Sequence, residues 1–462
     1  MVEPNEGHVR RLTEAYVREF QSSAISHARS LEVLVDGISH GARTYAPFPL
    51  RIVQAQGAWI TDTAGHRLLD YWQGHYANIL GHNPPEVTSF LIESLQHASG
   101  LQTGLPEEQE IEYCELLAKA TGSERVRLTT SGTLATMYAL MIARAHTGRK
   151  VVVKVGGGWH GANPLALKGV AHNESGYDSV DSAGVSPTAD DEIIITCFND
   201  VEALERVFAS QGDRIAAFIF EPCPSVAGFI PASRAYMETA RRLTYHYGAS
   251  LILDEVITGF RYCASGVQRL YGIQADISTY GKIIGGGMPI AAVTGRDDLL
   301  SLTSEHAHPR VWFNGGTYSA HPLSLTGGLS MLRHLVSNEQ TVYEVLARRG
   351  RALRQGIERV MAERGILARC TADGNEIVQG GSLSSVYFPK QADLQPQGPD
   401  DLNDPRLCDV QMRETVLKLG LLLHGVNVVH GLGALSMAHG DREIAATCEA
   451  FDRLAEEIQD SR

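Results

Sequence analysis

The sequence has few cysteines, and none of them stand close enough to pair locally. Its seven cysteines form no CxxC pair, and their number is odd. Both facts argue against a disulfide framework or a zinc site and favour a reducing compartment. The N-terminal stretch is polar rather than apolar, unlike a signal peptide, and no run of about eighteen apolar residues occurs anywhere. We therefore expect a cytoplasmic protein without a metal site or a membrane span.

An excess of positive charge is also missing. The 462 residues include 40 basic and 53 acidic side chains, which gives a formal net charge of −13. A negative chain repels nucleic acid and anionic membranes, so neither is an expected partner. With 44% apolar residues, the chain is long enough for a large core and for two or three structural units.

What the sequence does contain is an alternation of helical stretches with short apolar runs. The runs are predicted as strands and cover residues 150–155, 192–196, 216–222, 250–256, 276–280 and 291–295. Apolar strands separated by helices indicate an α/β fold, with a mostly parallel central sheet covered by helices on both faces.

Segments on either side of this block predict a smaller α/β domain. Residues 8–35 have helical spacing, residues 51–72 alternate like a β-hairpin, and the polar, proline-bearing residues 391–406 are predicted as a surface loop. We divide the chain into residues 1–84 (helix, connector and hairpin), 85–325 (the large domain) and 326–462 (the C-terminal part of the small domain).

An acidic pair ends one of the predicted strands. Asp254 and Glu255 follow the apolar run of "SLILDEV", at the carboxyl end where ligands bind in open parallel sheets. On this stretch alone, an acid that caps the next turn is an equally good interpretation.

A lysine stands 28 positions further on, in "STYGKIIGGGMP" (278–289). An amine in a tight, apolar turn is desolvated and loses proton affinity, which suits Schiff-base chemistry at Lys282. Taken alone, a surface lysine in a loop is the commoner case. The glycines that follow would let the chain turn and pack closely beside a ligand.

Two further glycine-bearing strand ends resemble parts of a ligand site. Ser131, Gly132 and Thr133 precede a long helix, and hydroxyls with free N–H groups at a helix start bind anions such as phosphate. A plain N-cap is the alternative. Trp159 and His160 follow "KVGGG", where an aromatic ring could stack on a flat heterocycle or simply pack in the core.

Together these four features meet the needs of pyridoxal 5'-phosphate (PLP). An acid can pair with the pyridine nitrogen, a lysine can bind the aldehyde, a helix start can hold the phosphate and an aromatic can cover the ring. A dinucleotide-binding oxidoreductase is the competing class, but its GxGxxG must directly follow a first strand, and the glycines at 285–287 do not.

The motifs "LDEVITGFR" (253–261), "YGKIIGGGMP" (280–289), "TSGTLAT" (130–136) and "GGWHG" (157–161) resemble those of class III, fold-type I PLP-dependent aminotransferases. The similarity is greatest to the glutamate-1-semialdehyde 2,1-aminomutase subgroup and the β-amino-acid aminotransferases, and it covers about residues 35–440. It implies the fold-type I architecture and a homodimer with shared active sites.

The resemblance also implies roles for individual residues. Lys282 would form the Schiff base and move the proton, and Asp254 would keep the pyridine nitrogen protonated. The other residues implied to bind the cofactor are Ser131, Gly132, Thr133, Trp159, His160, Glu221, Val256 and, from the partner subunit's loop, Thr317. Residues implied to bind the substrate are Arg43, Tyr45 and His430; an arginine fork matches a carboxylate.

The sequence departs from the family pattern in places that concern the substrate. Leu134 replaces the usual glutamate after "SGT", the stretch after Glu221-Pro222 differs, and residues 428–439 lack the acid expected in an aminomutase. We therefore predict an aminotransferase that moves an amino group between a carboxylate-bearing amino acid and an oxo acid by ping-pong chemistry. An intramolecular aminomutase, or a racemase, is the alternative.

Overall fold

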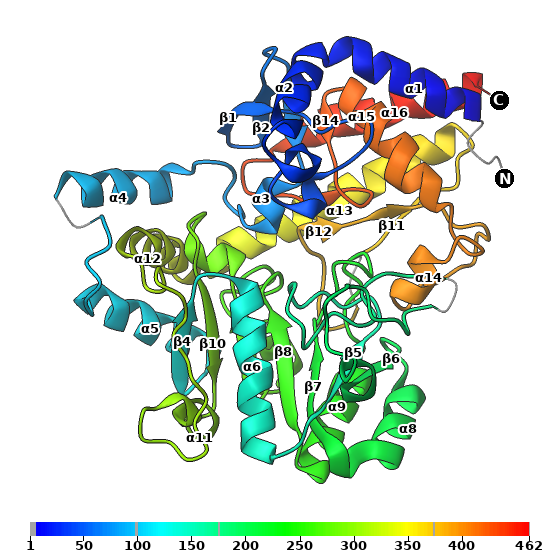
Figure 1. Ribbon diagram of the computed structural model, residues 1–462. Helices are drawn as coiled ribbons and strands as arrows, with labels where there is room; N and C mark the ends of the chain where they lie inside the picture. Colours follow the sequence, from blue (N-terminus) through cyan, green and yellow to red (C-terminus); the bar gives the residue numbers. More distant parts are fainter. Residues whose placement is uncertain (1–5, 98–99, 174–175, 373–374, 462) are drawn as a thin grey trace.

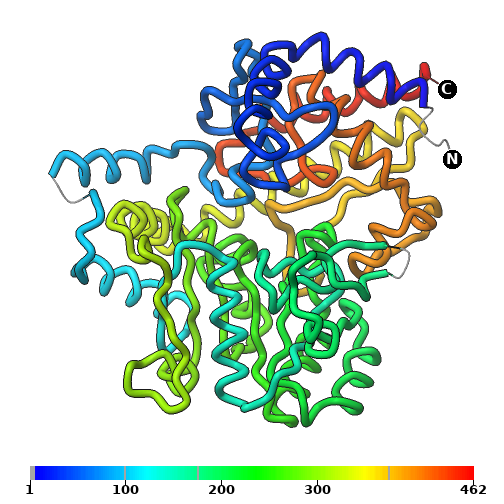
Figure 2. The backbone as a smooth tube through the Cα atoms, viewed as in Figure 1, coloured from blue at the N-terminus to red at the C-terminus, as the bar shows by residue number. Residues whose placement is uncertain are grey.

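The computed structural model describes residues 6–97, 100–173, 176–372 and 375–461. It consists of a lower body built on one large sheet and an upper body that contains both ends of the chain (Figure 1). The same division is visible in the backbone trace, where the blue N-terminal and red C-terminal segments occupy the upper body together (Figure 2).

The lower body is organised around a seven-stranded sheet with the order β4-β10-β9-β8-β7-β5-β6. Its strands are β4 (Arg125–Thr129), β5 (Val151–Val155), β6 (Ile193–Thr196), β7 (Ile215–Phe220), β8 (Ser250–Glu255), β9 (Ile277–Tyr280) and β10 (Ala291–Gly295). The strands from β9 to β6 are parallel, whereas β10 runs antiparallel to both of its neighbours. The predicted α/β fold with a mostly parallel sheet is confirmed.

Alternate residues of these strands are buried on opposite faces of the sheet. Phe218 and Leu251 pack with side chains of α8 (Val201–Gln211) and α9 (Arg234–Tyr247). Their neighbours Ile219 and Ile252 pack on the other face. That face is covered by α6 (Gly132–Thr147), which crosses the sheet in front in Figure 1. Burial on both faces explains why the strands are almost entirely apolar.

Residues at both ends of α6 explain its bounds. Ser131 is extended and its hydroxyl oxygen accepts the N–H of Leu134 at 3.3 Å, as an N-cap does. Gly148 follows the last turn with φ +67°, the left-handed conformation that ends many helices.

The upper body combines the two ends of the chain in one sheet. Its strands are β1 (Ile52–Gln56), β2 (Trp59–Asp62), β3 (Arg67–Asp70) and β14 (Val426–Asn427). The first three form an antiparallel meander, and β14 adds in parallel to β3. Its helices are α1 (Glu6–Glu19), α2 (Gln21–Leu31), α13 (Glu339–Glu363), α15 (Leu417–Leu423) and α16 (Asp441–Asp460). The predicted smaller domain of N- and C-terminal segments is thus present.

The remaining helices and strands are α3 (Gln73–Tyr76), α4 (Pro85–Gln96), α5 (Glu108–Thr121), α7 (Ala189–Glu192), α10 (Gln268–Tyr271), α11 (Asp297–Leu300), α12 (Pro322–Ser337), β11 (Arg369–Cys370), β12 (Leu383–Ser384), β13 (Val386–Tyr387) and β15 (Gly433–Ala434). No helix within the described ranges is both long and apolar enough to span a bilayer.

Two local expectations need correction. The hairpin predicted over residues 51–72 is a three-stranded meander, because Ala58 and its neighbours turn the chain once more than the pattern indicated. The predicted surface loop at 391–406 contains α14 (Pro399–Asn403), which is held to the molecule by the buried side chains of Pro399 and Leu402.

Candidate active site

Asp254 lies at the carboxyl end of β8 and is met by three hydrogen-bond donors. His160 Nδ1 lies 2.8 Å from Oδ2, while the Thr279 hydroxyl and the Val256 N–H lie 3.0 and 3.1 Å from Oδ1. The neighbouring Glu255 points away and binds the Thr258 hydroxyl at 2.6 Å. Of the acidic pair in the sequence, Asp254 is therefore the one that faces the site residues.

His160 follows β5 and is completely buried beside Asp254. Burial lowers the pKa of His160, and the hydrogen bond to Asp254 opposes that shift. A neutral imidazole that donates Nδ1–H would fix the carboxylate in place. His160 Nε2 has no hydrogen-bond partner among the described residues.

Lys282 begins the 3₁₀ turn η4 (Lys282–Gly285), directly after β9. Its φ is +52°, an uncommon value for a residue other than glycine. Burial lowers the pKa of the Lys282 amine, while the negative charge of Asp254 partly restores it. A larger neutral fraction makes the amine a better nucleophile.

The glycines after Lys282 serve a packing role. A Cβ atom on Gly286 would lie 2.3 Å from the backbone oxygen of Gly327 in α12. Gly286 therefore lets α12 approach closely.

The start of α6 has the features of an anion site. Helix geometry leaves the first N–H groups of a helix without acceptors inside the helix. The Ser131 hydroxyl oxygen accepts the N–H of Leu134, and the Ser131 carbonyl oxygen accepts the N–H of Ala135. The N–H groups of Gly132 and Thr133 remain for an external acceptor. Gly161 has φ +80°, and a Cβ there would lie 2.4 Å from Thr133 Oγ1. Any residue other than glycine at this position would displace the Thr133 hydroxyl.

Val256 and Glu221 contact the segments that carry the other site residues. Val256 lies between the two motifs, because a Cβ on Gly132 or on Gly281 would meet its Cγ1 at 2.8 and 3.2 Å. Glu221 accepts the N–H of Trp159 at 3.0 Å. Burial, followed by the charge of Asp254, raises the pKa of Glu221 to about 8. Trp159 is 40% exposed.

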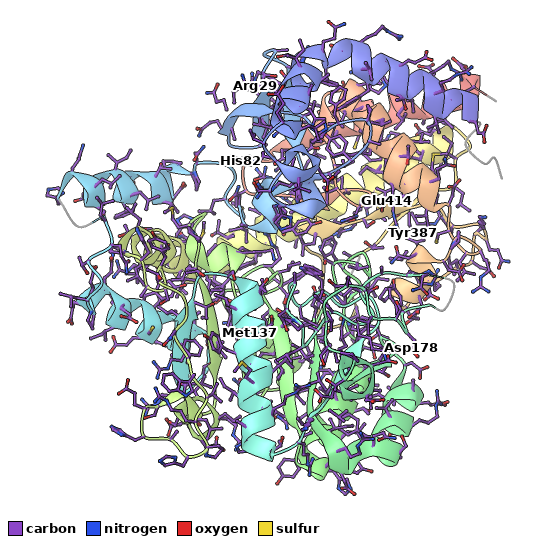
Figure 3. The ribbon with its side chains drawn as sticks, viewed as in Figure 1. Arg29, His82, Met137, Asp178, Tyr387 and Glu414 are labelled. Atoms are coloured by element: carbon purple, nitrogen blue, oxygen red, sulfur yellow. The ribbon has the colours of Figure 1, made fainter. Side chains whose placement is uncertain are left out.

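The implied substrate residues are divided between two cavities. Arg43 and Tyr45 line a cavity of about 430 Å³ together with His75 and His82. His430 lines another of about 840 Å³, where its Nδ1 lies 3.4 Å from Glu414 in the π-helical turn η6 (Met412–Val416). Figure 3 labels one residue of each cavity, His82 and Glu414, well apart in the upper body. No hydrogen bond or ion pair joins His430 to Arg43 among the described residues.

Thr317 is exposed, and its carbonyl oxygen accepts a hydrogen bond from Gln102 at 3.1 Å. It makes no contact with the site residues above among the hydrogen bonds of the described chain.

Sequence reasoning missed three residues at or near the site. Thr279 faces Asp254 because the two are paired across β8 and β9, a register that single strands do not reveal. His75 and Glu414 lie outside every motif. The only sequence signal for His75 is the preceding Gly74, which marks a tight turn.

These residues have the chemical properties that PLP requires of its site. The donor-bound acid, the desolvated amine and the free amides of a long helix match the ring nitrogen, the aldehyde and the phosphate of the cofactor. Gly132 and Gly161 let Val256 and Thr133 approach the start of this helix closely, which keeps the site compact.

Comparison with known proteins identifies the family. The Aminotransferase class-III model matches residues 40–393. The glutamate-1-semialdehyde 2,1-aminomutase of Thermoplasma volcanium is 32% identical over 423 residues, which are 91% of this chain and 96% of that protein. The chain belongs to the class III aminotransferases, as its motifs indicated, and the family uses PLP.

Solved structures agree with this assignment. An omega-transaminase from Sphaerobacter thermophilus superposes with a TM-score of 0.84 at 29% identity and covers 95% of this chain and 98% of its own. A transaminase with PLP bound gives a TM-score of 0.83 at 28% identity, with 96% and 98% covered. The fold-type I expectation is confirmed, and the protein is an enzyme that acts on small molecules.

Proposed function

We propose that the enzyme transfers an amino group between a carboxylate-bearing amino acid and an oxo acid. The observation that carries this proposal is the position of the desolvated Lys282 amine within the field of Asp254. Such an amine can take a proton from a substrate carbon and give it back at a second carbon.

When bound, PLP supplies a reactive aldehyde and a ring that withdraws electrons from the bond to be broken. Lys282 would hold the aldehyde, and its amine, when free, would take the proton from the carbon that bears the nitrogen. Asp254, held by His160 and Thr279, would keep the proton on the ring nitrogen. Gly132 and Thr133 would hold the phosphate through their N–H groups.

Arg43 would hold the carboxylate of the substrate. It is exposed, and no carboxylate among the described residues pairs with its guanidinium. A free planar fork of N–H donors suits a bidentate carboxylate. This anchor would orient the reacting C–H bond relative to the ring.

We favour transfer over intramolecular exchange because residues 428–439 contain no acid. Intramolecular transfer is the second candidate, since relatives carry the aminomutase name. The two differ in one requirement: transfer needs an added oxo acid for turnover, and an aminomutase does not.

We also propose that the enzyme is a homodimer. Large apolar side chains are exposed along α4, α5 and the loops near them, namely Phe90, Ile92, Leu95, Leu101, Leu105, Ile111, Trp312 and Tyr318. In Figure 1, α4 extends away from the rest of the molecule. Exposed apolar groups of this kind favour burial against a partner.

The experiment is a panel of amino donors and oxo acceptors on the PLP-loaded enzyme. We expect one amino acid alone to give a single partial turnover, and the addition of an oxo acid to give many. Sustained turnover without an oxo acid would instead establish a mutase or racemase. Lys282→Ala should lose the visible absorbance of the lysine-bound cofactor, whereas Lys150→Ala, an exposed control, should keep it.

A further inference from the structure

The turn that carries His75 has an unusual backbone. Four consecutive residues of α3, Gln73–Tyr76, have positive φ values of 45°, 62°, 58° and 69°. An L-residue in this left-handed conformation is strained, and only Gly74 avoids that strain. Strained turns of this kind persist where the surrounding structure holds them, and they are concentrated at functional sites.

Both ends of the turn are held by buried charged groups. At its start, Asp70 accepts the N–H groups of Trp72 at 3.0 Å and Gln73 at 2.9 Å. At its end, the buried guanidinium of Arg261 donates to the carbonyl oxygen of Tyr76. Two separate anchors therefore fix a conformation that the sequence itself disfavours.

The turn lies beside the proposed catalytic lysine. It packs against η4, the turn that begins with Lys282, where the two bodies of the molecule meet (Figure 1). The positive charges of His40, Arg43 and Lys282 add to burial in lowering the pKa of His75 to about 4. His75 therefore lies within the electrostatic reach of both Lys282 and Arg43.

The neutral ring of His75 contacts Arg43 directly. Its Nε2 atom accepts a hydrogen bond from Arg43 Nε at 3.2 Å. The ring centroid lies 4.3 Å from that of Trp72 and 4.8 Å from that of His40, so aromatic neighbours fix its orientation. Because the bond uses Nε, the two terminal nitrogens of Arg43 stay available for a planar carboxylate.

We infer that His75 is a positioning residue, which aims the Arg43 guanidinium at the carboxylate of the substrate without neutralising it. An aspartate or glutamate in this place would pair with Arg43 and compete with the substrate. A neutral acceptor holds the side chain and leaves its charge for the ligand. This inference rests on the proposed function of Arg43, and the experiment separates the two.

The variants His75→Gln and His75→Met form a matched pair, because both side chains are unbranched and similar in length. They share the backbone strain of the turn and differ in the acceptor, which Gln keeps and Met lacks. The probe is butanoate, a carboxylate without an amine, titrated into PLP-loaded enzyme and followed by calorimetry. Butylamine, an amine without a carboxylate, is the comparison substrate.

We expect His75→Met to weaken butanoate binding about tenfold, in line with the loss of one hydrogen bond to a charged group, and His75→Gln to stay within about threefold of the parent. The loss of butylamine turnover in His75→Met should be smaller than its loss of butanoate binding. Equal loss of butanoate binding in both variants, or an equal loss for butanoate and butylamine, would overturn the inference. The inference would also be overturned if His75→Met left butanoate binding unchanged while Arg43→Ala weakened it.

If Arg43→Ala itself leaves butanoate binding unchanged, the proposed carboxylate role of Arg43 fails, and the inference fails with it.

Discussion

The Nδ1 atom of His160 lies 2.8 Å from the Oδ2 atom of Asp254, and both side chains are buried. The two residues come from different strand ends and are 94 positions apart in the chain. The contact links the glycine-rich loop after β5 to the acid that we propose for the ring nitrogen.

Replacement of His160 by Phe tests this link, because the ring volume is retained while the donor is lost. A hydrogen bond to a charged group contributes about 1.5–3 kcal/mol, so kcat/KM should fall by roughly 10- to 150-fold. Thr279→Val removes another neutral donor to the same carboxylate, so its loss of kcat/KM should fall within the same range. Steady-state kinetics and PLP titration measure both variants. If His160→Phe left kcat/KM and PLP affinity unchanged, the orienting role of His160 would be wrong.

Glu221 gives a prediction about pH. In the unfolded chain its carboxyl has the ordinary pKa of 4.5, whereas burial raises the pKa to about 8 in the fold. Between these values the native state holds a proton that the unfolded state releases, so this group makes stability fall as pH rises. Glu221→Gln is neutral throughout and keeps an acceptor for the Trp159 N–H.

The melting temperature of Glu221→Gln relative to the parent should therefore increase from pH 5 to pH 8, as measured by scanning calorimetry. Glu202→Gln, at an exposed position of α8, is the matched control and should show no such trend. A difference between Glu221→Gln and the parent that is constant over this range would contradict the assignment of a protonated carboxyl.

Lys154 carries a prediction about stability. This completely buried amine donates to the carbonyl oxygens of Gly158, Ala166 and Lys168 at 2.9, 3.3 and 2.8 Å. Burial lowers the pKa of Lys154 to about 8, so its charge is costly to hold, yet the three acceptors depend on it.

Lys154→Met should lower the free energy of unfolding by roughly 2–5 kcal/mol, because buried carbonyl groups lose their donor. The loop that carries His160 would loosen as well, so PLP affinity should fall. The exposed Lys150→Met, four residues away, should leave both quantities unchanged. Thermal unfolding and cofactor titration measure the two effects. Equal stability of the two variants would show that the loop is held by other contacts.

The comparison of sequence with structure separates local from long-range information. The strand that carries Asp254 near its end, the N-cap at Ser131 and the lysine turn could be predicted because each is encoded by a short stretch. The antiparallel direction of β10 could not, since apolar strands look the same in either direction. The register that places Thr279 beside Asp254 depends on how two strands pair, which neither strand encodes alone.

The substrate side of the site was harder to predict for the same reason. His75 acts through a left-handed turn that Asp70 and Arg261 hold from distant parts of the chain. Arg43 was found through family resemblance, while its partner His75 was not. His430, expected from resemblance to bind the substrate, lines a different cavity and lies beside Glu414.

The last prediction concerns Thr317, which is exposed in the single chain. If Thr317 reaches the phosphate of the partner subunit, Lys282→Ala and Thr317→Ala should complement each other in mixed dimers. One site of each hybrid would then combine a native Lys282 with the native Thr317 of the other chain, while the second site would carry both changes. Each hybrid should therefore recover about half of the parent activity, measured after the two inactive variants are unfolded and refolded together. If Thr317 acted within its own chain, every site of the hybrid would carry one change, and mixing would restore nothing. Recovery in the mixture thus tests the dimer and the shared site in one experiment.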